Sequence, residues 1–191
     1  MSRNEQVTIV SGLPRSGTSM MMGMLEAGGI SPLTDGIRAA DEDNPKGYYE
    51  FERAKKIKED TAWLDDAKGK VVKVISQLLL SLPESHRYKI VFMQREMGEI
   101  LASQRQMLIR RGTDSRDVSD EQMGPMLAKH VEQVMGWIEK HDNVECLPVN
   151  YNDVLKDAGP NIDRINQFLG GDLDTAAMTA VVDRSLYRQR K

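Results

Sequence analysis

The chain has 191 residues and a formal net charge of −3 at neutral pH, a length that suits one domain over residues 1–191 with a core of its own. The slightly acidic charge argues against nucleic acid as a partner, and a single cysteine, Cys146, excludes an internal disulfide and favours a reducing compartment. No apolar run approaches the ~18 residues of a membrane span and no signal-peptide core follows Met1, so we expect a cytoplasmic protein without a membrane contact.

The first predicted elements are a strand, a loop and a helix. A β-branched run at 7–10 predicts a buried strand, the loop at 11–17 is rich in Gly, Pro and Ser, and the apolar segment 20–26 predicts a helix that ends at Gly28 and Gly29. In such a unit the backbone N–H groups converge on the loop, and the helix dipole adds positive potential there. The sequence therefore predicts a phosphate site at the start of the helix.

The loop departs from the Walker A pattern. Gly12 and Gly17 have the G-x-x-x-x-G spacing, but Thr18 and Ser19 follow where that pattern has Lys and Ser or Thr. The positively charged residue of this loop is Arg15, upstream of the Walker A lysine position. The loop thus lacks the lysine that binds the terminal phosphates of a triphosphate. The plainer alternative is an ordinary turn between strand and helix, in which the glycines are needed only for the backbone conformation.

A candidate base follows the polar segment 31–47, which is dense in Asp, Glu and Pro. Glu50 stands among aromatic residues after a glycine turn, before a predicted helix with Ala54, Ile57 and Leu64 on its apolar side. Aromatic neighbours could desolvate the carboxyl group and raise its pKa toward the working pH, as general-base catalysis favours. The plainer alternative is a carboxylate that the dipole favours at a helix N-terminus.

The next two strands are predicted over 70–75 and 88–93. Lys73 places a charge inside the first of these apolar runs, where an unpaired charge would be costly, so we expect it to reach a partner or an anion near the strand end. The alternative is an edge-strand lysine in solvent. The second run ends at Gln94 and Arg95, without the Asp that a magnesium-dependent P-loop enzyme uses there, so we expect no metal.

A long amphipathic helix is predicted over 96–111. Arg95 precedes it and Ser103 lies two turns along it, so a charged fork and a neutral donor could converge on one anion. The alternative is an ordinary ion pair at Arg95 and a surface position for Ser103.

The rest of the chain continues the alternation of strands and helices. Gly124 and Pro125 predict the opening of another helix, although Ser119 and Gln122 form a capping box that allows a short turn before it. A strand over 144–149 follows. Strands that alternate with helices predict an α/β fold with helical layers on a central parallel sheet of about four to five strands, and the ligand is expected over the carboxyl ends of those strands.

Two blocks resemble a known family. Residues 14–19, Pro-Arg-Ser-Gly-Thr-Ser, resemble the P-[KR]-S-G-T-[ST] loop with which sulfotransferases hold the 5′-phosphosulfate of 3′-phosphoadenosine 5′-phosphosulfate (PAPS). The spacing from Arg95 to Ser103 resembles the family's R-x(7)-S block for the 3′-phosphate, and residues 150–155 are similar to its Y-E-D-L-L segment. The resemblance implies a small soluble sulfotransferase of bacterial type with a three-layer P-loop-like fold over the whole chain.

The resemblance also implies roles for single residues. The residues implied to hold the nucleotide are Pro14, Arg15, Ser16, Gly17, Thr18, Ser19, Arg95, Ser103 and Arg190 in the basic tail. Lys73 matches the lysine of the family's V-K-[TS]-H segment, whereas Ile75 stands where that segment has its catalytic histidine. Glu50 is therefore our candidate base, with His86 in reserve, and an acceptor that needs no base is the third possibility.

The predicted reaction is transfer of a sulfuryl group from PAPS to a hydroxyl or amine acceptor, with Arg15 and Lys73 stabilising the charge on the leaving nucleotide. Two other functions stay open. A P-loop nucleotide kinase would need the lysine and the strand-end Asp that the chain lacks, and a non-catalytic nucleotide-binding module would keep the fold without the base. The acceptor depends on loops 31–50 and 112–124, in which no recognition pattern stands out, and the sequence does not define an oligomeric state.

Overall fold

The computed structural model describes residues 5–37, 47–110, 112 and 119–183. Its strands are β1 (Val7–Gly12), β2 (Val71–Lys73), β3 (Tyr88–Gln94) and β4 (Val144–Asn150). Its helices are α1 (Thr18–Ala27), α2 (Glu52–Lys55), α3 (Trp63–Asp66), α4 (Ser76–Leu79), α5 (Met97–Arg110), α6 (Asp120–Ile138), α7 (Tyr151–Lys156), α8 (Ala158–Leu169) and α9 (Thr175–Val181).

The four strands form one parallel sheet in the order β2-β1-β3-β4. All six residues of β1 are buried, as expected for a strand at the centre of a sheet that is covered on both faces. Val10 is in register with both Lys73 and Val91, so the carboxyl ends of the three neighbouring strands meet at one edge. The predicted parallel sheet is confirmed, with four strands in the described residues.

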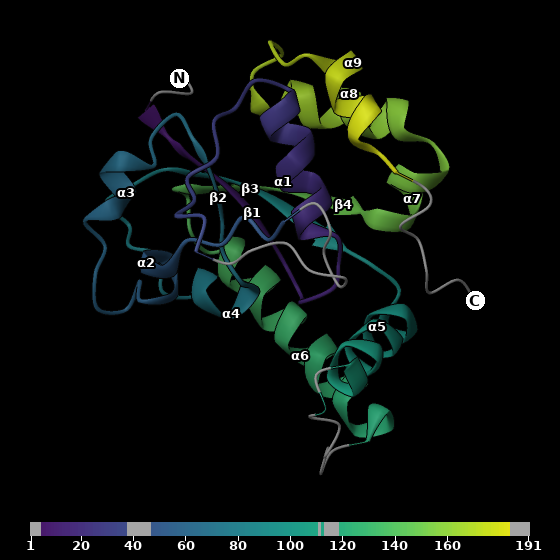
Figure 1. Cartoon of the computed structure of the whole chain (residues 1–191). Helices are drawn as coiled ribbons and strands as arrows, with labels where there is room; N and C mark the ends of the chain where they lie inside the picture. Colours follow the sequence, from purple (N-terminus) through teal and green to yellow (C-terminus); the bar gives the residue numbers. More distant parts are fainter. Residues whose placement is uncertain (1–4, 38–46, 111, 113–118, 184–191) are drawn as a thin grey trace.

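Successive strand residues contribute to two separate cores. Val10 and Val91 belong to a core with α1, α7, α8 and α9, whereas Ile9 and Ile90 belong to a second core with α3, α4 and α6. Figure 1 shows α1, α8 and α9 on one side of the sheet and α4 and α6 on the other. Because each face is covered by helices, the architecture is the predicted three-layer α/β fold.

The start of α6 differs from the prediction. The helix begins at Asp120, because the Ser119 hydroxyl accepts a bond from the Gln122 N–H at 3.4 Å while the Gln122 side chain accepts one from the Ser119 N–H at 3.2 Å. This capping box satisfies the first N–H groups of the helix. Pro125 therefore lies inside α6, and the prediction that a helix opens at residues 124–125 was wrong.

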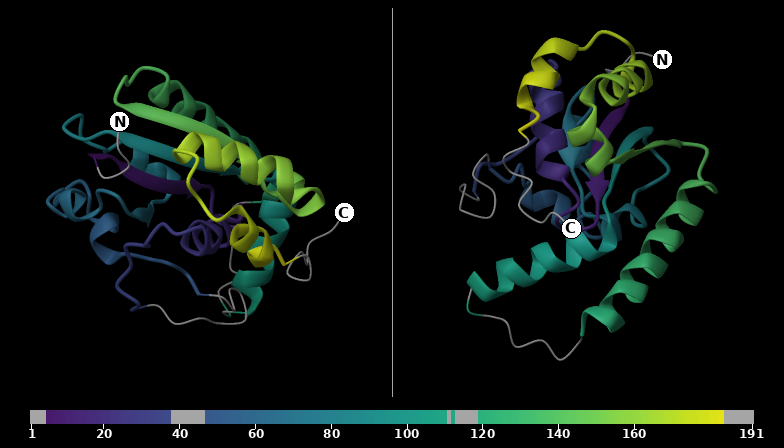
Figure 2. Two further views of the ribbon diagram at one scale, coloured as in Figure 1. Left: turned by 90° about the horizontal axis from the view of Figure 1, so that it is seen from above. Right: turned by 90° about the vertical axis from the view of Figure 1, so that its right-hand side faces the viewer.

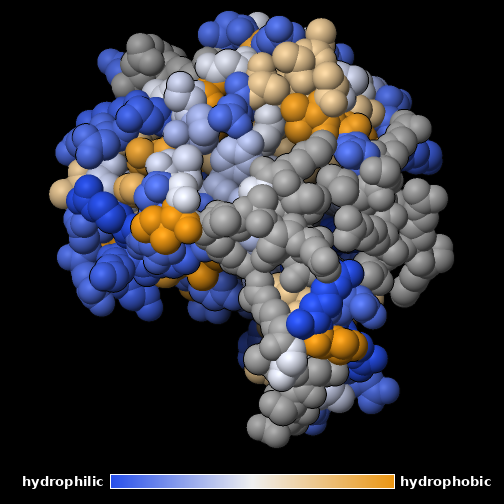
Figure 3. All heavy atoms as spheres, in the orientation of Figure 1, coloured by the Kyte–Doolittle hydropathy of each residue, from blue (hydrophilic) through white to orange (hydrophobic). Residues whose placement is uncertain are grey.

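Helices α5 and α6 pack against each other and extend together beyond the sheet (Figures 1 and 2). The same projection forms the lower part of the space-filling view in Figure 3. Two of its apolar side chains, Ile109 and Met126, are exposed. Among the helices of the described residues, none has the length and hydropathy needed to cross a bilayer.

Candidate active site

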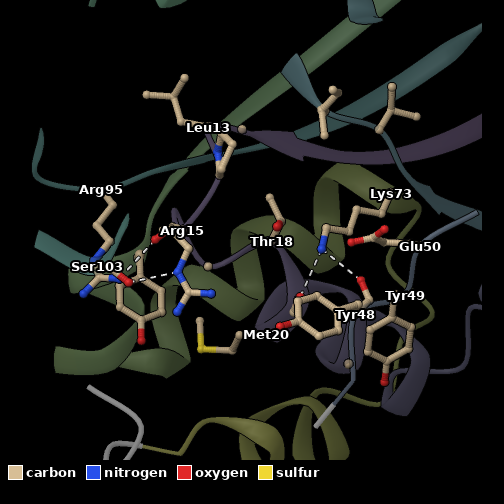
Figure 4. A pocket seen from close by; sticks show the side chains of 18 of the residues that line it. Leu13, Arg15, Thr18, Met20, Tyr48, Tyr49, Glu50, Lys73, Arg95 and Ser103 are labelled. Atoms are coloured by element: carbon tan, nitrogen blue, oxygen red, sulfur yellow. Dashed lines mark hydrogen bonds between the residues drawn. The ribbon is translucent and has the colours of Figure 1, made fainter. Parts of the chain in front are cut away.

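A cavity of about 890 Å³ lies over the carboxyl ends of β1 and β2. Its wall combines the loop after β1, the first turn of α1, the segment around α2, the end of β2 and one side of α5. The volume lies in the range of small-molecule sites, and the position is where a parallel sheet is expected to bind its ligand. Figure 4 shows Arg95 and Ser103 at one side of the cavity and Lys73 and Glu50 at the other.

The two loop glycines are required by close packing. Gly12 has φ 147° and Gly17 has φ 98°, and a Cβ atom at Gly17 would lie 2.3 Å from the Tyr151 ring. Gly17 is also the N-cap of α1, and a glycine offers no side chain to bond the first N–H groups. Since the first turn of α1 contains no acidic residue, the positive end of this helix faces the cavity without a carboxylate of its own, as an anion site requires.

Most of the predicted loop residues line the cavity, namely Pro14, Arg15, Gly17, Thr18 and Ser19. Ser16 does not. Its side chain is fully buried behind the loop, its Oγ has no hydrogen-bond partner in the described part of the chain, and its N–H donates to the Leu13 carbonyl at 3.1 Å. The buried side chain of Ser16 is therefore part of the interior of the loop and does not line the cavity.

Arg15 connects the loop with the start of α5. Its Nε donates to the Ser103 hydroxyl at 2.9 Å, and its carbonyl accepts a bond from Arg95 Nη1 at 3.0 Å. Its φ of 75° is left-handed, a conformation that costs free energy in a non-glycine residue and that occurs often at functional sites. The structure thus brings together the two blocks that the sequence placed far apart.

Arg95 is held from three sides. Its Nε donates to Glu99 Oε2 at 2.8 Å, with both side chains largely buried, and its guanidinium lies 4.6 Å from the centre of the Tyr151 ring. The Asn152 amide donates to both oxygens of Glu99, at 3.0 and 3.1 Å. The ordinary ion pair that we considered for Arg95 is therefore present, and the same arginine also lines the cavity.

Sequence reasoning missed the residues that hold Arg95. Arg95 lies just before α5 and Glu99 in its first turn, and a spacing of four residues between opposite charges at a helix is a recognisable ion-pair signal. No comparable signal pointed to Tyr151 or Asn152, which follow β4 and reach Arg95 only because β4 is the neighbour of β3. Burial raises the pKa of Tyr151 against a smaller lowering by the charge of Arg95, so its hydroxyl stays protonated at neutral pH.

Lys73 reaches partners inside the cavity. Its Nζ donates to the Ser19 hydroxyl at 3.1 Å and to the Tyr48 carbonyl at 2.9 Å (Figure 4). This confirms the expectation that the lysine finds a partner near the strand end. β2 is an edge strand, yet the ammonium group lies in the cavity wall.

Glu50 also lines the cavity, where its carboxylate accepts a bond from Lys55 Nζ at 2.7 Å. Hydrogen bonds from Glu50 and then Glu52 raise the pKa of Lys55. Glu52 is the acidic residue in the first turn of α2, and Phe51 is its N-cap. Glu50 therefore precedes the helix, so the plainer alternative of a carboxylate in the first turn fits Glu52 better.

His86 cannot be the reserve base. It lies just before β3, and the carbonyl of its neighbour Arg87 accepts a bond from the N–H of Val7 at the start of β1. Its ring contacts Asp65 at 3.3 Å. Because the cavity lies at the carboxyl ends of the strands, this position at their amino ends excludes His86 from the site. Arg190, the remaining predicted nucleotide contact, lies outside the described residues.

Tyr49 is a cavity residue that the sequence did not single out. Its hydroxyl donates to Glu26 Oε2 at 2.6 Å, and burial followed by the bond to Glu26 raises its pKa to about 12. Its φ is 53°. Arg15 and Tyr49 are the non-glycine residues with left-handed φ in the described part of the chain, and both line this cavity.

The comparisons with known proteins agree with this geometry. The sulfotransferase domain family matches residues 5–191. The chain belongs to this family. Family membership makes it a sulfotransferase and favours sulfuryl transfer over the nucleotide kinase that the sequence left open.

A solved structure is similar to this sulfotransferase in its fold. The sulfotransferase domain from the Synechococcus PCC 7002 olefin synthase superposes with a TM-score of 0.55 over 97% of this chain and 88% of that one. The identity is 14%, so this likeness concerns the fold alone. A comparison with curated protein sequences gave no match. Within the described residues, no group of three or more His, Cys, Asp or Glu side chains could hold a metal ion.

Proposed function

We propose that this sulfotransferase moves a sulfuryl group from PAPS to a hydroxyl or amine acceptor. One observation carries the choice of donor. Arg15 bonds to both Ser103 and Arg95, so the loop suited to a 5′-phosphosulfate and the pair suited to a 3′-phosphate share one cavity wall. ADP has no phosphate at the 3′ position of the ribose, whereas PAPS has a 3′-phosphate for one block and a 5′-phosphosulfate for the other.

The residues of the wall fit an anionic nucleotide. The first turn of α1 supplies N–H groups and a positive helix end, while Arg15 and Lys73 supply the charge that the Walker A lysine would bring to a P-loop enzyme. Arg95 lines the cavity while its Nε donates to Glu99 and its Nη1 donates to the Arg15 carbonyl. A guanidinium is a charged, planar donor group that suits a phosphate, so we assign Arg95 to the 3′-phosphate.

In the reaction, the bond between sulfur and the bridging oxygen of the nucleotide breaks while a bond from sulfur to the acceptor forms. Negative charge grows on the bridging oxygen, and Arg15 and Lys73 are the groups proposed to stabilise it. The acceptor must also lose a proton. We assign this proton to Glu50, which lines the cavity and lies two residues after Tyr48, whose carbonyl holds Lys73.

Calorimetry with two nucleotides tests the donor. 3′-Phosphoadenosine 5′-phosphate (PAP) and ADP both carry two phosphates and differ in where the second is attached. We expect PAP to bind at least ~10-fold more tightly in buffer with EDTA, because a hydrogen bond to a charged group contributes ~1.5–3 kcal/mol. Equal affinities for PAP and ADP would exclude PAPS as the donor.

A further inference from the structure

The two ends of the cavity differ in chemistry. Arg95 and Ser103 lie at one end, the loop and Thr18 lie between, and Lys73 lies toward the other (Figure 4). Four apolar side chains line the cavity from the segments that adjoin Glu50 and Lys73 in sequence, namely Phe51, Ala54, Ile75 and Leu78. We call these four residues the apolar end. A nucleotide anchored at Arg95 directs its reacting group toward Lys73, so the acceptor must approach from the apolar end.

Ile75 is an unusual residue for its position. It is 46% exposed, and of the four large apolar side chains exposed in the described residues it is the one that lines the cavity. It is also the N-cap of α4 and makes no side-chain cap bond, although isoleucine is among the least favoured N-cap residues. Neither burial nor helix capping explains an isoleucine here, and such local conflicts are expected at functional positions.

Phe51 is a second large apolar residue at a helix N-cap. It is the N-cap of α2, again without a side-chain cap bond. Its ring packs edge-to-face on the fully buried Trp63, with 5.6 Å between the ring centres. Phe51 and Leu78 both pack on the core that contains α3 and α4. The apolar end is therefore a surface fixed to the core of the protein, and two short helices each begin on it with a large apolar residue.

We propose that the apolar end is the acceptor site and that the acceptor is an alcohol with an apolar body, such as an alkyl chain. The body lies against Ile75 and Phe51, and the hydroxyl lies toward Lys73 and Glu50. A sugar would bring several hydroxyl groups against carbon side chains, where the loss of their bonds to water is not compensated. This inference rests on the proposed function only for the transfer step, because binding of the alcohol does not require a donor.

The step balances for an alcohol. The hydroxyl oxygen forms a bond to sulfur, the bond from sulfur to the nucleotide's 5′-phosphate oxygen breaks, and the hydroxyl proton passes to the Glu50 carboxylate. The products are an alkyl sulfate and PAP. No oxidant, reductant or metal enters this balance.

A homologous series of alcohols tests the proposal. We would measure the Kd of n-butanol, n-hexanol and n-octanol for the full chain, with and without PAP, and the sulfation of each alcohol and of glucose with PAPS. The Kd is expected to fall about 4-fold per added methylene, which is ~0.8 kcal/mol for each buried CH₂ group. An affinity that does not change with chain length, or sulfation of glucose in preference to octanol, would overturn the proposal.

Two matched variants locate the alcohol. Ile75→Asn is expected to raise the Kd of octanol at least ~10-fold, and it should not unfold the protein because asparagine is a favoured N-cap residue. Ile109→Asn is the control, since Ile109 is 50% exposed on α5 and does not line the cavity. It should leave the Kd of octanol unchanged. Equal effects of the two variants would show that octanol does not bind at the apolar end.

The outcomes separate this inference from the proposed donor. Binding of octanol that depends on Ile75, in a protein that does not prefer PAP to ADP, would retain the acceptor site and refute the donor. A clear preference for PAP together with transfer to glucose and not to octanol would retain the donor and refute the acceptor class.

Discussion

The two cations at opposite sides of the cavity are held in different ways. Arg95 lies in a buried ion pair with Glu99, against the Tyr151 ring and the Arg15 carbonyl. Among its contacts with described residues, Lys73 donates to the Ser19 hydroxyl and to the Tyr48 carbonyl. The first arrangement ties a binding group to a buried ion pair and so to the stability of the fold, whereas the second places an ammonium group in the cavity wall. Substitutions at the two sides should therefore affect different quantities.

The largest effect is expected for Arg95→Ala, and on stability. The substitution removes the guanidinium that pairs with the buried Glu99 carboxylate, and breaking a buried ion pair in this way typically costs ~3–5 kcal/mol in the free energy of unfolding. Urea denaturation measures this loss. The double variant Arg95→Met, Glu99→Leu should recover most of the stability without recovering the preference for PAP over ADP. An Arg95→Ala protein as stable as the parent would show that the Arg95–Glu99 ion pair does not contribute to the free energy of unfolding.

Lys73→Ala should produce the opposite result. We expect transfer to fall by ~3–4 kcal/mol of transition-state stabilisation, which is a factor of hundreds, as for other groups aimed at developing charge. The melting temperature should stay within a few degrees of the parent. Arg15→Ala should behave similarly in turnover, and Lys58→Ala, at an exposed lysine outside the cavity, is the control. A Lys73→Ala protein that unfolds, or that transfers sulfate normally, would make this lysine structural.

Glu50→Gln tests whether Glu50, on the same side of the cavity as Lys73, is the general base. The change keeps the shape of the side chain and removes its basicity, so a loss of ~100-fold in transfer with normal PAP binding would fit a general base. Glu52→Gln is a matched control, because Glu52 accepts a bond from the same Lys55 at 2.6 Å and does not line the cavity. Near-normal transfer by the Glu50→Gln variant at every pH would show that the reaction does not use this carboxylate.

The smallest effect is expected for Tyr49→Phe, which removes the bond to Glu26 and should cost ~0.5–1.5 kcal/mol in unfolding free energy. The pKa of Tyr49 is about 12 in the folded protein and about 10 in an unfolded chain. A pKa that is raised on folding stabilises below the unfolded value and loses that effect as pH rises toward the folded value. The difference between parent and variant should therefore be constant up to pH ~9 and shrink above ~10. A difference that does not change with pH would contradict this.

Features carried by residues next to one another in sequence predicted the fold well. The buried strands follow from apolar β-branched runs that are too short for helices. Gly12 and Gly17 stand at the two ends of a tight loop, where a Cβ atom would clash with neighbouring atoms. The predicted start of α6 at Gly124 and Pro125 was wrong, because the capping box at Ser119 begins the helix earlier. Pro125 inside the helix removes one backbone hydrogen bond and strains the turn before it, and the other contacts of α6 tolerate this.

The site was predicted only where its residues are close in sequence or share a pattern with the family. Lys73 stood out because a charge in a buried strand needs a partner. The hypothesis that His86 is the reserve base was wrong, because a residue just before β3 lies at the amino ends of parallel strands and the cavity lies at their carboxyl ends. The bond from Asn152 to Glu99 and the presence of Phe51 and Ile75 in one cavity lining depend on tertiary structure that joins distant segments, and no local periodicity in the sequence indicates it.

The central place of β1 has a consequence for how the chain is made. Of the four strands β1 is synthesised first, and both strands that pair with it follow much later. Val7 is in register with Tyr88 and Gly12 with Met93, so each partner lies about 80 residues further along the chain. Synthesis at roughly 5–20 residues per second therefore leaves this strand, whose six residues are all buried in the folded protein, without its neighbours for seconds. A fragment that ends before β3 would leave the edge of β1 that pairs with β3 exposed, which favours aggregation, so the loop after β1 can acquire its binding shape only once β3 has been made.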